Sequence, residues 1–150
     1  MLTMSNAVKI LSAGMLPLLA GILFHYLLMS LPAGNPLMLL LALALLAAWV
    51  CLAYRVSKSQ KNPVIQAFLL SAFGLLMLAL ALYQELIMGR YWLNFLGLAP
   101  QMYFLPFVPL TSLVTVPFTD VMRPWPAYIV IWAGLFLTGW LGCWLKRRRA

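Results

Sequence analysis

Long runs of hydrophobic residues alternate along the chain with short stretches that contain proline or charged residues. A helix needs about 20 apolar residues to cross the hydrocarbon core of a bilayer. Four runs approach or exceed this length, and their charged residues lie at or near their ends. The runs are residues 8–31, 37–54, 64–88 and 125–145. The pattern predicts an all-α, polytopic integral membrane protein whose four transmembrane helices form a bundle.

The first run contains Pro17, but a membrane helix tolerates proline, so we expect one helix across the membrane here. A secretory signal with a cleavage site near Leu31-Pro32-Ala33 is the alternative interpretation. The apolar run is longer than the hydrophobic region of most signals, and the cleavage site is poor. A retained transmembrane helix is therefore favoured, and cleavage would leave the other three helices in the same orientation.

The composition supports a lipid environment, because 65% of the 150 residues are hydrophobic and only 8% are charged. A soluble domain carries about 25% charged residues. A chain of this length has room for one compact unit, so we expect residues 1–150 to form a single membrane domain.

The basic residues predict the orientation of the helices, since cytoplasmic loops collect Lys and Arg. With the N-terminus inside, eight of the ten basic residues fall on the cytoplasmic side. They are Lys9, Arg55, Lys58, Lys61, Lys146, Arg147, Arg148 and Arg149. We therefore expect a multi-pass protein of the plasma or inner membrane with both termini in the cytoplasm. The net charge of +8 is explained by topology, so membrane lipids are the expected partners and nucleic acid is not.

The outer loop, residues 89–124, is apolar but contains several prolines that would repeatedly interrupt a spanning helix. A fifth span would also place the basic residues 146–149 outside, against the charge rule. We therefore expect an extracytoplasmic segment that is either interfacial or re-entrant. Its aromatic residues favour the depth of the membrane interface. They are Tyr91, Trp92, Phe95, Tyr103 and Phe104.

Few polar residues lie near membrane depth, namely His25, Gln66, Gln84 and Glu85. The first and third predicted helices both run outward, which brings His25 and Glu85 to similar depths near the outer surface. Together with nearby charged residues they form a candidate outer polar cluster: His25, Glu85, Arg90, Asp120 and Arg123. A structural role, in which Glu85 pairs with an arginine, is the favoured interpretation because polar groups near the interface cost less than those at mid-bilayer.

The fourth predicted helix has two distinct faces. Aromatic residues recur at steps of three and four, and we expect this face to meet lipid or, alternatively, a partner subunit, a quinone or a sterol-like lipid. Gly134, Thr138 and Gly142 recur every four residues on the other side, a pattern typical of close helix packing. We expect these three residues to form a helix-packing face.

The sequence contains no phosphate-binding glycine loop and no HExxH, GxSxG or paired-carboxylate motif. Cys51 and Cys143 have no neighbouring ligands for zinc, so no cofactor or metal is expected.

A non-enzymatic accessory, assembly or sensing component is the favoured function, with a membrane partner subunit or self-association. The alternatives are a small transporter or channel component that uses the outer polar cluster, and a membrane enzyme or binding protein for a lipid or quinone.

Overall fold

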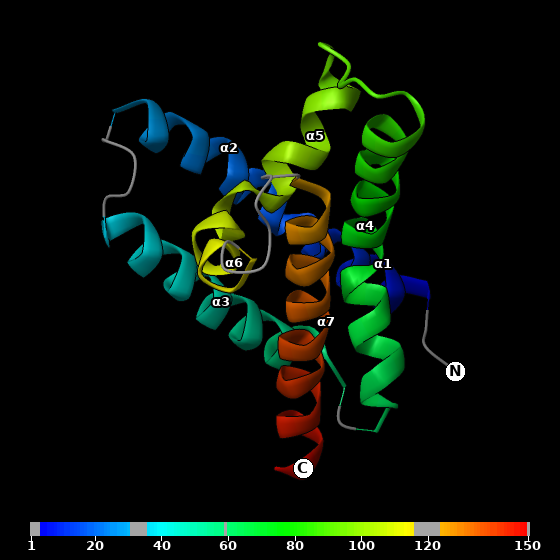
Figure 1. Ribbon diagram of the computed structural model, residues 1–150. Helices are drawn as coiled ribbons and strands as arrows, with labels where there is room; N and C mark the ends of the chain where they lie inside the picture. The colour runs from blue at the N-terminus through cyan, green and yellow to red at the C-terminus, as the bar shows by residue number, and fades with distance from the viewer. Residues whose placement is uncertain (1–3, 31–35, 59, 116–123, 150) are drawn as a thin grey trace.

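A computed structural model describes four parts of the chain, residues 4–30, 36–58, 60–115 and 124–149. These residues form helices and short connections, and they include no β-strand (Figure 1). Four helical stretches are long and apolar enough to cross a membrane. They are Asn6–Ser30, Pro36–Val56, Pro63–Ile87 and Pro124–Arg148. The all-helical class and the four candidate spans predicted from the sequence are therefore confirmed.

The first candidate span is divided into α1 (Met4–Ala13) and α2 (Leu16–Ser30), rather than forming the one continuous helix expected. Pro17 has no N–H to bond to the preceding turn. The N–H of Leu18 bonds to the carbonyl of Met15 at 3.0 Å rather than to that of Gly14. The carbonyl of Gly14 accepts a hydrogen bond from the Tyr103 hydroxyl at 3.3 Å. The break is therefore stabilised by a distant part of the chain, which the local sequence does not reveal.

The second and third spans are α3 (Pro36–Val56) and α4 (Pro63–Leu82), and a π-helical turn, η1 (Tyr83–Ile87), extends α4. Asn62 caps α4 by accepting a hydrogen bond from the N–H of Val64 at 2.9 Å. Pro63 occupies the first turn, where the missing N–H leaves no bond unmade. These local signals explain why α4 begins where the sequence predicts.

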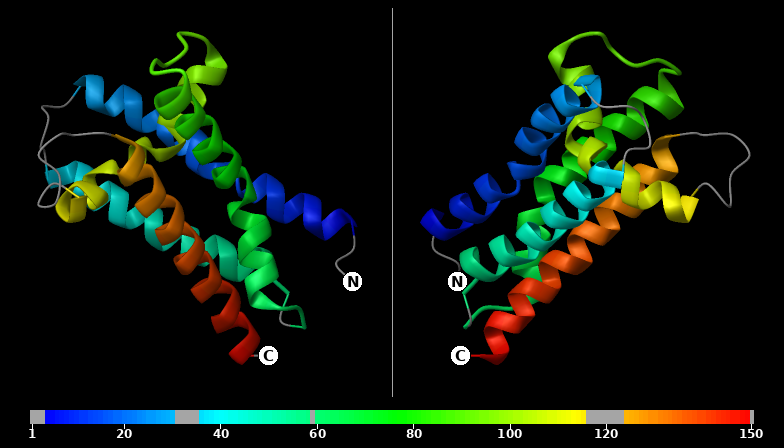
Figure 2. Two further views of the ribbon diagram at one scale, coloured as in Figure 1. Left: turned by 45° about the vertical axis from the view of Figure 1, so that its right-hand side comes forward. Right: turned by 90° about the vertical axis from the view of Figure 1, so that its left-hand side faces the viewer.

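The described part of the outer loop contains α5 (Phe95–Phe104), the 3₁₀ turn η2 (Leu105–Phe107) and α6 (Val108–Thr115). Pro106 and Pro109 lie where the segment divides, because each removes a backbone donor, whereas Pro100 lies inside α5. α5 packs against both α2 and α4, so it lies between them in the upper half of the bundle (Figures 1 and 2). A Cβ atom on Gly21 of α2 would collide with the carbonyl of Met102, so this position requires glycine.

The last span, α7 (Pro124–Arg148), packs along α4 and α3. The indole N–H of Trp49 on α3 donates to the carbonyl of Leu135 at 2.8 Å. The buried face of α7 consists of Tyr128, Ile131, Leu135, Gly139, Gly142 and Cys143. The core therefore lies between α3, α4 and α7 in one half, and between α2, α4 and α5 in the other.

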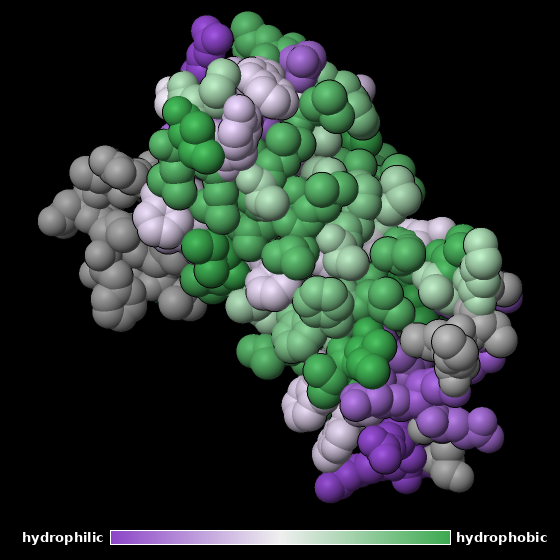
Figure 3. Space-filling model, turned by 90° about the vertical axis from the view of Figure 1, so that its right-hand side faces the viewer, coloured by the Kyte–Doolittle hydropathy of each residue, from purple (hydrophilic) through white to green (hydrophobic). Residues whose placement is uncertain are grey.

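The exterior carries large exposed hydrophobic side chains, including Leu23, Leu40, Phe68, Leu76 and Leu137. Figure 3 shows a hydrophobic band along the side of the bundle, with a strongly hydrophilic surface at the end where α7 finishes. Such a band is the surface that a helical bundle presents to hydrocarbon. We call the hydrophilic end, formed by Arg55, Lys58, Lys61 and residues 146–149, the basic end.

Candidate functional site

The structure places the five residues of the candidate outer polar cluster in different settings. Glu85 lies in η1, and its Oε2 accepts a hydrogen bond from the Tyr91 hydroxyl at 2.6 Å. Burial, together with this hydrogen bond, raises the pKa of the Tyr91 phenol above its usual value. Arg90 is exposed, while Asp120 and Arg123 lie outside the described residues. The interactions of Glu85 with these last two residues therefore stay a prediction.

His25 lies on α2, where its ring centroid is 6.1 Å from that of Tyr26. Within the described residues, no hydrogen bond or ion pair joins His25 to Glu85. The arrangement of the helices accounts for this, because α5 lies between α2 and α4 at this end of the bundle. The structure thus brings Glu85 to Tyr91 rather than to His25.

Gln84 is fully buried beside Glu85 and is not one of the five residues of the candidate outer polar cluster. Its Oε1 accepts a hydrogen bond from the N–H of Trp92 at 3.1 Å, and the Gln84 carbonyl accepts one from the N–H of Arg90 at 3.1 Å. Its Nε2 has no partner among the described residues. Gln84 therefore shapes the turn that connects η1 to α5. In the sequence, the amide side chain of Gln84 within an otherwise apolar run was the signal that could have indicated this role.

Tyr103 provides the polar contact at the centre of the bundle. Its side chain is fully buried, and its hydroxyl donates to the carbonyl of Gly14 at the break between α1 and α2. Gly74 makes room for this ring, since a Cβ there would lie 2.7 Å from the Tyr103 hydroxyl oxygen. This contact ties α5 to the first span and to α4.

Gln66 performs a similar structural task near the basic end. Its Oε1 accepts a hydrogen bond from the N–H of Lys58 at 2.6 Å. Its Nε2 donates to the carbonyls of Lys58 at 3.0 Å and Lys61 at 3.3 Å. The side chain thereby fixes the connection between α3 and α4.

The residues of the predicted packing face on α7 have unequal surroundings. A Cβ on Gly142 would lie 2.5 Å from the carbonyl oxygen of Val50, so α3 approaches closely there. A Cβ on Gly134 would have no such neighbour within 4 Å in the part of the chain that the structure describes, and the Thr138 hydroxyl donates to the Gly134 carbonyl at 2.7 Å. On the aromatic side, the indole of Trp132 donates to the Ser71 carbonyl on α4 at 3.3 Å. Close packing on α3 is therefore found at the basic half of α7.

Gly134 lies instead in a shallow groove of about 150 Å³ between α3, α6 and α7. The groove is apolar apart from one threonine. Its lining residues are Leu46, Phe107, Leu110, Thr111, Val130, Ile131, Gly134 and Leu135. We call this feature the Gly134 groove. It opens on the side of the bundle, within the candidate spans.

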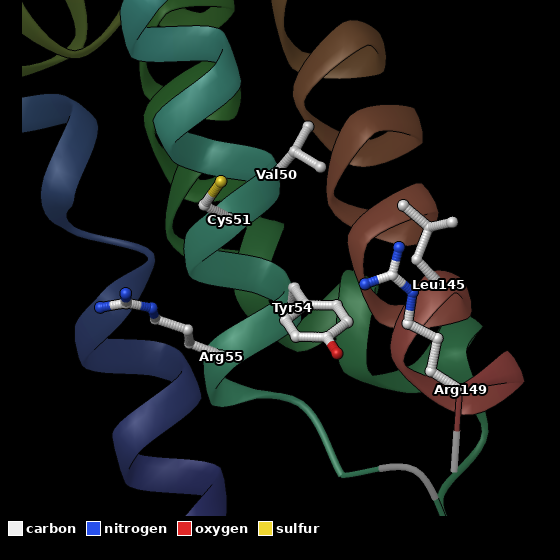
Figure 4. Close-up of a pocket in the computed structure, with 6 residues that line it drawn as sticks. All are labelled: Val50, Cys51, Tyr54, Arg55, Leu145 and Arg149. Atoms are coloured by element: carbon white, nitrogen blue, oxygen red, sulfur yellow. The ribbon is translucent and has the colours of Figure 1, made fainter.

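A second pocket, of about 280 Å³, lies between the ends of α3 and α7 (Figure 4). It is lined by Val50, Cys51, Tyr54, Arg55, Leu145 and Arg149. Most of its lining is apolar, and of its two arginines Arg149 runs along α7, whereas the guanidinium of Arg55 points to the other side of α3. We call it the basic-end pocket.

Within the described residues, no group of three or more His, Cys, Asp or Glu side chains is arranged to hold a metal ion. Cys51 is exposed and Cys143 is buried, and both are free thiols. No family model, curated protein or solved structure matches the chain. The function of the chain is therefore inferred from its own contacts and surfaces.

Proposed function

We propose that the chain is a non-enzymatic accessory component of a membrane assembly, which docks beside a transmembrane helix of another protein. The observation that carries this proposal is the use of its buried polar side chains. Gln66, Gln84 and Tyr103 each bond to backbone groups of another element, as do the indoles of Trp49 and Trp132. These contacts build a rigid framework, which suits a protein that acts through its shape and its outer surface.

The Gly134 groove is the favoured docking surface. It lies among the candidate spans, and a Cβ on Gly134 would meet no atom of the described residues within 4 Å. Small residues in membrane helices allow another helix to approach closely. A volume of about 150 Å³ suits one large apolar side chain of a partner helix. The proposed occupant is therefore a transmembrane helix of a different protein.

Photo-crosslinking in native membranes tests this proposal. A photoreactive amino acid replaces Val130, which is 39% exposed at the rim of the groove, or Phe68, which is 49% exposed on α4. We expect a discrete adduct with one identified membrane protein from position 130 and none from the control position 68. Gly134→Leu, which puts a side chain into the groove from a position where a Cβ meets no atom of the described residues within 4 Å, should abolish the adduct.

Three outcomes would contradict the proposal: an adduct between two copies of this chain, equal adducts from both positions, or an adduct that Gly134→Leu leaves unchanged.

The break between α1 and α2 supports the alternative of a transporter, because transporter sites use discontinuous helices. The carbonyl of Gly14 at this break, however, is bonded to Tyr103. The accessory role therefore remains the better supported of the two.

The proposal includes a topology in which four helices span the plasma or inner membrane and both termini are cytoplasmic. The basic end supports this orientation, because Lys146 donates to the Arg55 carbonyl at 3.0 Å and thus joins the end of α7 to that of α3. A re-entrant path for α5 is supported by the complete burial of Tyr103 and Phe104 against other helices. Irregular backbone is tolerated at membrane depth when protein surrounds it.

Cysteine labelling tests the orientation in a Cys51→Ala background. A membrane-impermeant maleimide should modify a cysteine at Leu93, which is 97% exposed, in intact cells. It should modify a cysteine at the exposed Gln60 only after the membrane has been opened. Modification of position 60 in intact cells would show the opposite orientation.

A further inference from the structure

The basic-end pocket combines an apolar wall with two arginines at the end of two candidate spans. We propose that it binds an anionic phospholipid, with an acyl chain along Val50, Cys51 and Leu145 and the headgroup phosphate at Arg149. This site is separate from the Gly134 groove, and its assignment does not depend on the accessory role. The chemistry it recognises is a phosphate group attached to a long hydrocarbon chain.

The position of the wall along the helices fits a lipid. Val50 lies six residues before the end of α3, so it sits about 9 Å from that end at 1.5 Å per residue. Leu145 lies in the last turn of α7, and Arg149 follows that helix. The pocket thus runs from acyl-chain depth towards the level of the headgroups.

The cations at this end differ in what they contact. Lys146 bonds to the Arg55 carbonyl and lies 5.8 Å from the centroid of the Tyr54 ring. Arg148 lies 4.0 Å from the ring centre of Trp144, outside the pocket. The guanidinium of Arg149 has no partner within the described residues. The guanidinium of Arg55, the other cation that lines the pocket, likewise has no partner within the described residues, so the two arginines are the cations available to a ligand there.

Figure 4 shows how the two pocket arginines are directed. Arg149 runs back along α7 beside Leu145, whereas the guanidinium of Arg55 points to the other side of α3. A guanidinium can hold two phosphate oxygens at once, which favours Arg149 as the phosphate ligand. Arg55 and Lys58 contribute to the local positive potential, which attracts anionic lipid.

The positive charge around this pocket favours the binding of an anion from outside the chain. Glu85 is the single acidic residue among the described residues, and it lies in η1 at the far end of α4. No carboxylate of the described chain therefore neutralises the two arginines of the pocket. An anionic headgroup supplies the missing negative charge.

Cys51 provides a reporter, because its thiol is exposed and lines the pocket, whereas Cys143 is buried. The full chain is placed in nanodiscs of phosphatidylcholine alone or of equal parts phosphatidylcholine and phosphatidylglycerol. The rate of Cys51 alkylation by N-ethylmaleimide is followed by intact mass. We expect phosphatidylglycerol to slow this reaction severalfold. Inorganic phosphate added to phosphatidylcholine nanodiscs should leave the rate unchanged.

Two variants separate binding in the pocket from the general effect of a negative surface. Arg149→Gln should remove most of the protection of Cys51, because it removes the guanidinium that would hold the phosphate by charge-assisted hydrogen bonds. Arg148→Gln removes an equal charge outside the pocket and should retain the protection. Equal protection in both variants would mean that surface potential alone slows the reaction, and would overturn the proposal. Protection by inorganic phosphate alone would show that the site takes free phosphate instead of a lipid.

Discussion

The two ends of the bundle differ in how many charged side chains they leave at the surface. At the end where α4 meets α5, Glu85 accepts a hydrogen bond from Tyr91, and the buried Gln84 accepts one from the N–H of Trp92. At the basic end, the uncharged Ser57 and Gln66 are buried, whereas Arg55, Lys58 and residues 147–149 are exposed. Uncharged polar groups thus maintain the fold at both ends, and most charged side chains of the basic end remain accessible to other molecules.

This difference follows from what each end contains. The upper half accommodates α5 between α2 and α4, and its turns expose backbone groups that need partners inside the protein. The lower half consists of the ends of α3, α4 and α7, where Asn62, Gln66 and Lys146 bond to backbone groups that the helix ends leave unpaired. Its other charged side chains are not needed for this purpose and stay at the surface.

Among the substitutions that test the difference between the two ends, Gly21→Val should cause the largest loss of stability. The added side chain would meet the backbone of Met102 and force α5 away from α2. Overpacking of this kind should lower the free energy of unfolding by about 3 kcal/mol. Thermal and chemical unfolding in detergent measures the change. Gly134→Val is the matched control, because no neighbour among the described residues lies within 4 Å of its Cβ. Equal losses in the two variants would show that α5 does not pack on α2 as described.

A smaller effect is expected from Tyr103→Phe, which removes the hydrogen bond to Gly14 without changing the shape of the ring. The loss in the free energy of unfolding should be about 1 kcal/mol, the usual net contribution of a buried hydrogen bond.

Arg149→Gln at the basic end should change stability by less than about 0.5 kcal/mol, as for most surface substitutions. The same unfolding measurement compares the two. If Arg149→Gln were the more damaging change, the contrast between the ends would be wrong.

The extents of the helices were largely predictable, because apolar length and proline position determine them. The predicted span 37–54 corresponds to α3, and the predicted span 64–88 corresponds to α4 together with η1. Asn62-Pro63 marked the start of α4 correctly because capping by asparagine and proline at the first turn is a local effect. Local chemistry of this kind can be read from neighbouring residues.

Features that depend on distant contacts were not predictable in the same way. The break at Gly14 is stabilised by Tyr103, which lies 89 residues further along the chain. The rotation of α7 is set by its packing on α3 and α4, so Gly142 contacts α3 while Gly134 faces the groove. For the candidate site, the sequence indicated that His25 and Glu85 reach similar depths. It carried no sign that α5 would lie between their helices.

The location of α5 also constrains the order of assembly during biosynthesis. Residues 95–104 leave the ribosome after α2 and α4, yet they occupy the space between those two helices. We therefore expect the space between α2 and α4 to close around α5 only after this later segment has been made. The contact between α1 and α4 near Gly14 and Leu70 can form earlier, since both helices precede α5. We expect α5 to enter the bundle in a step of its own.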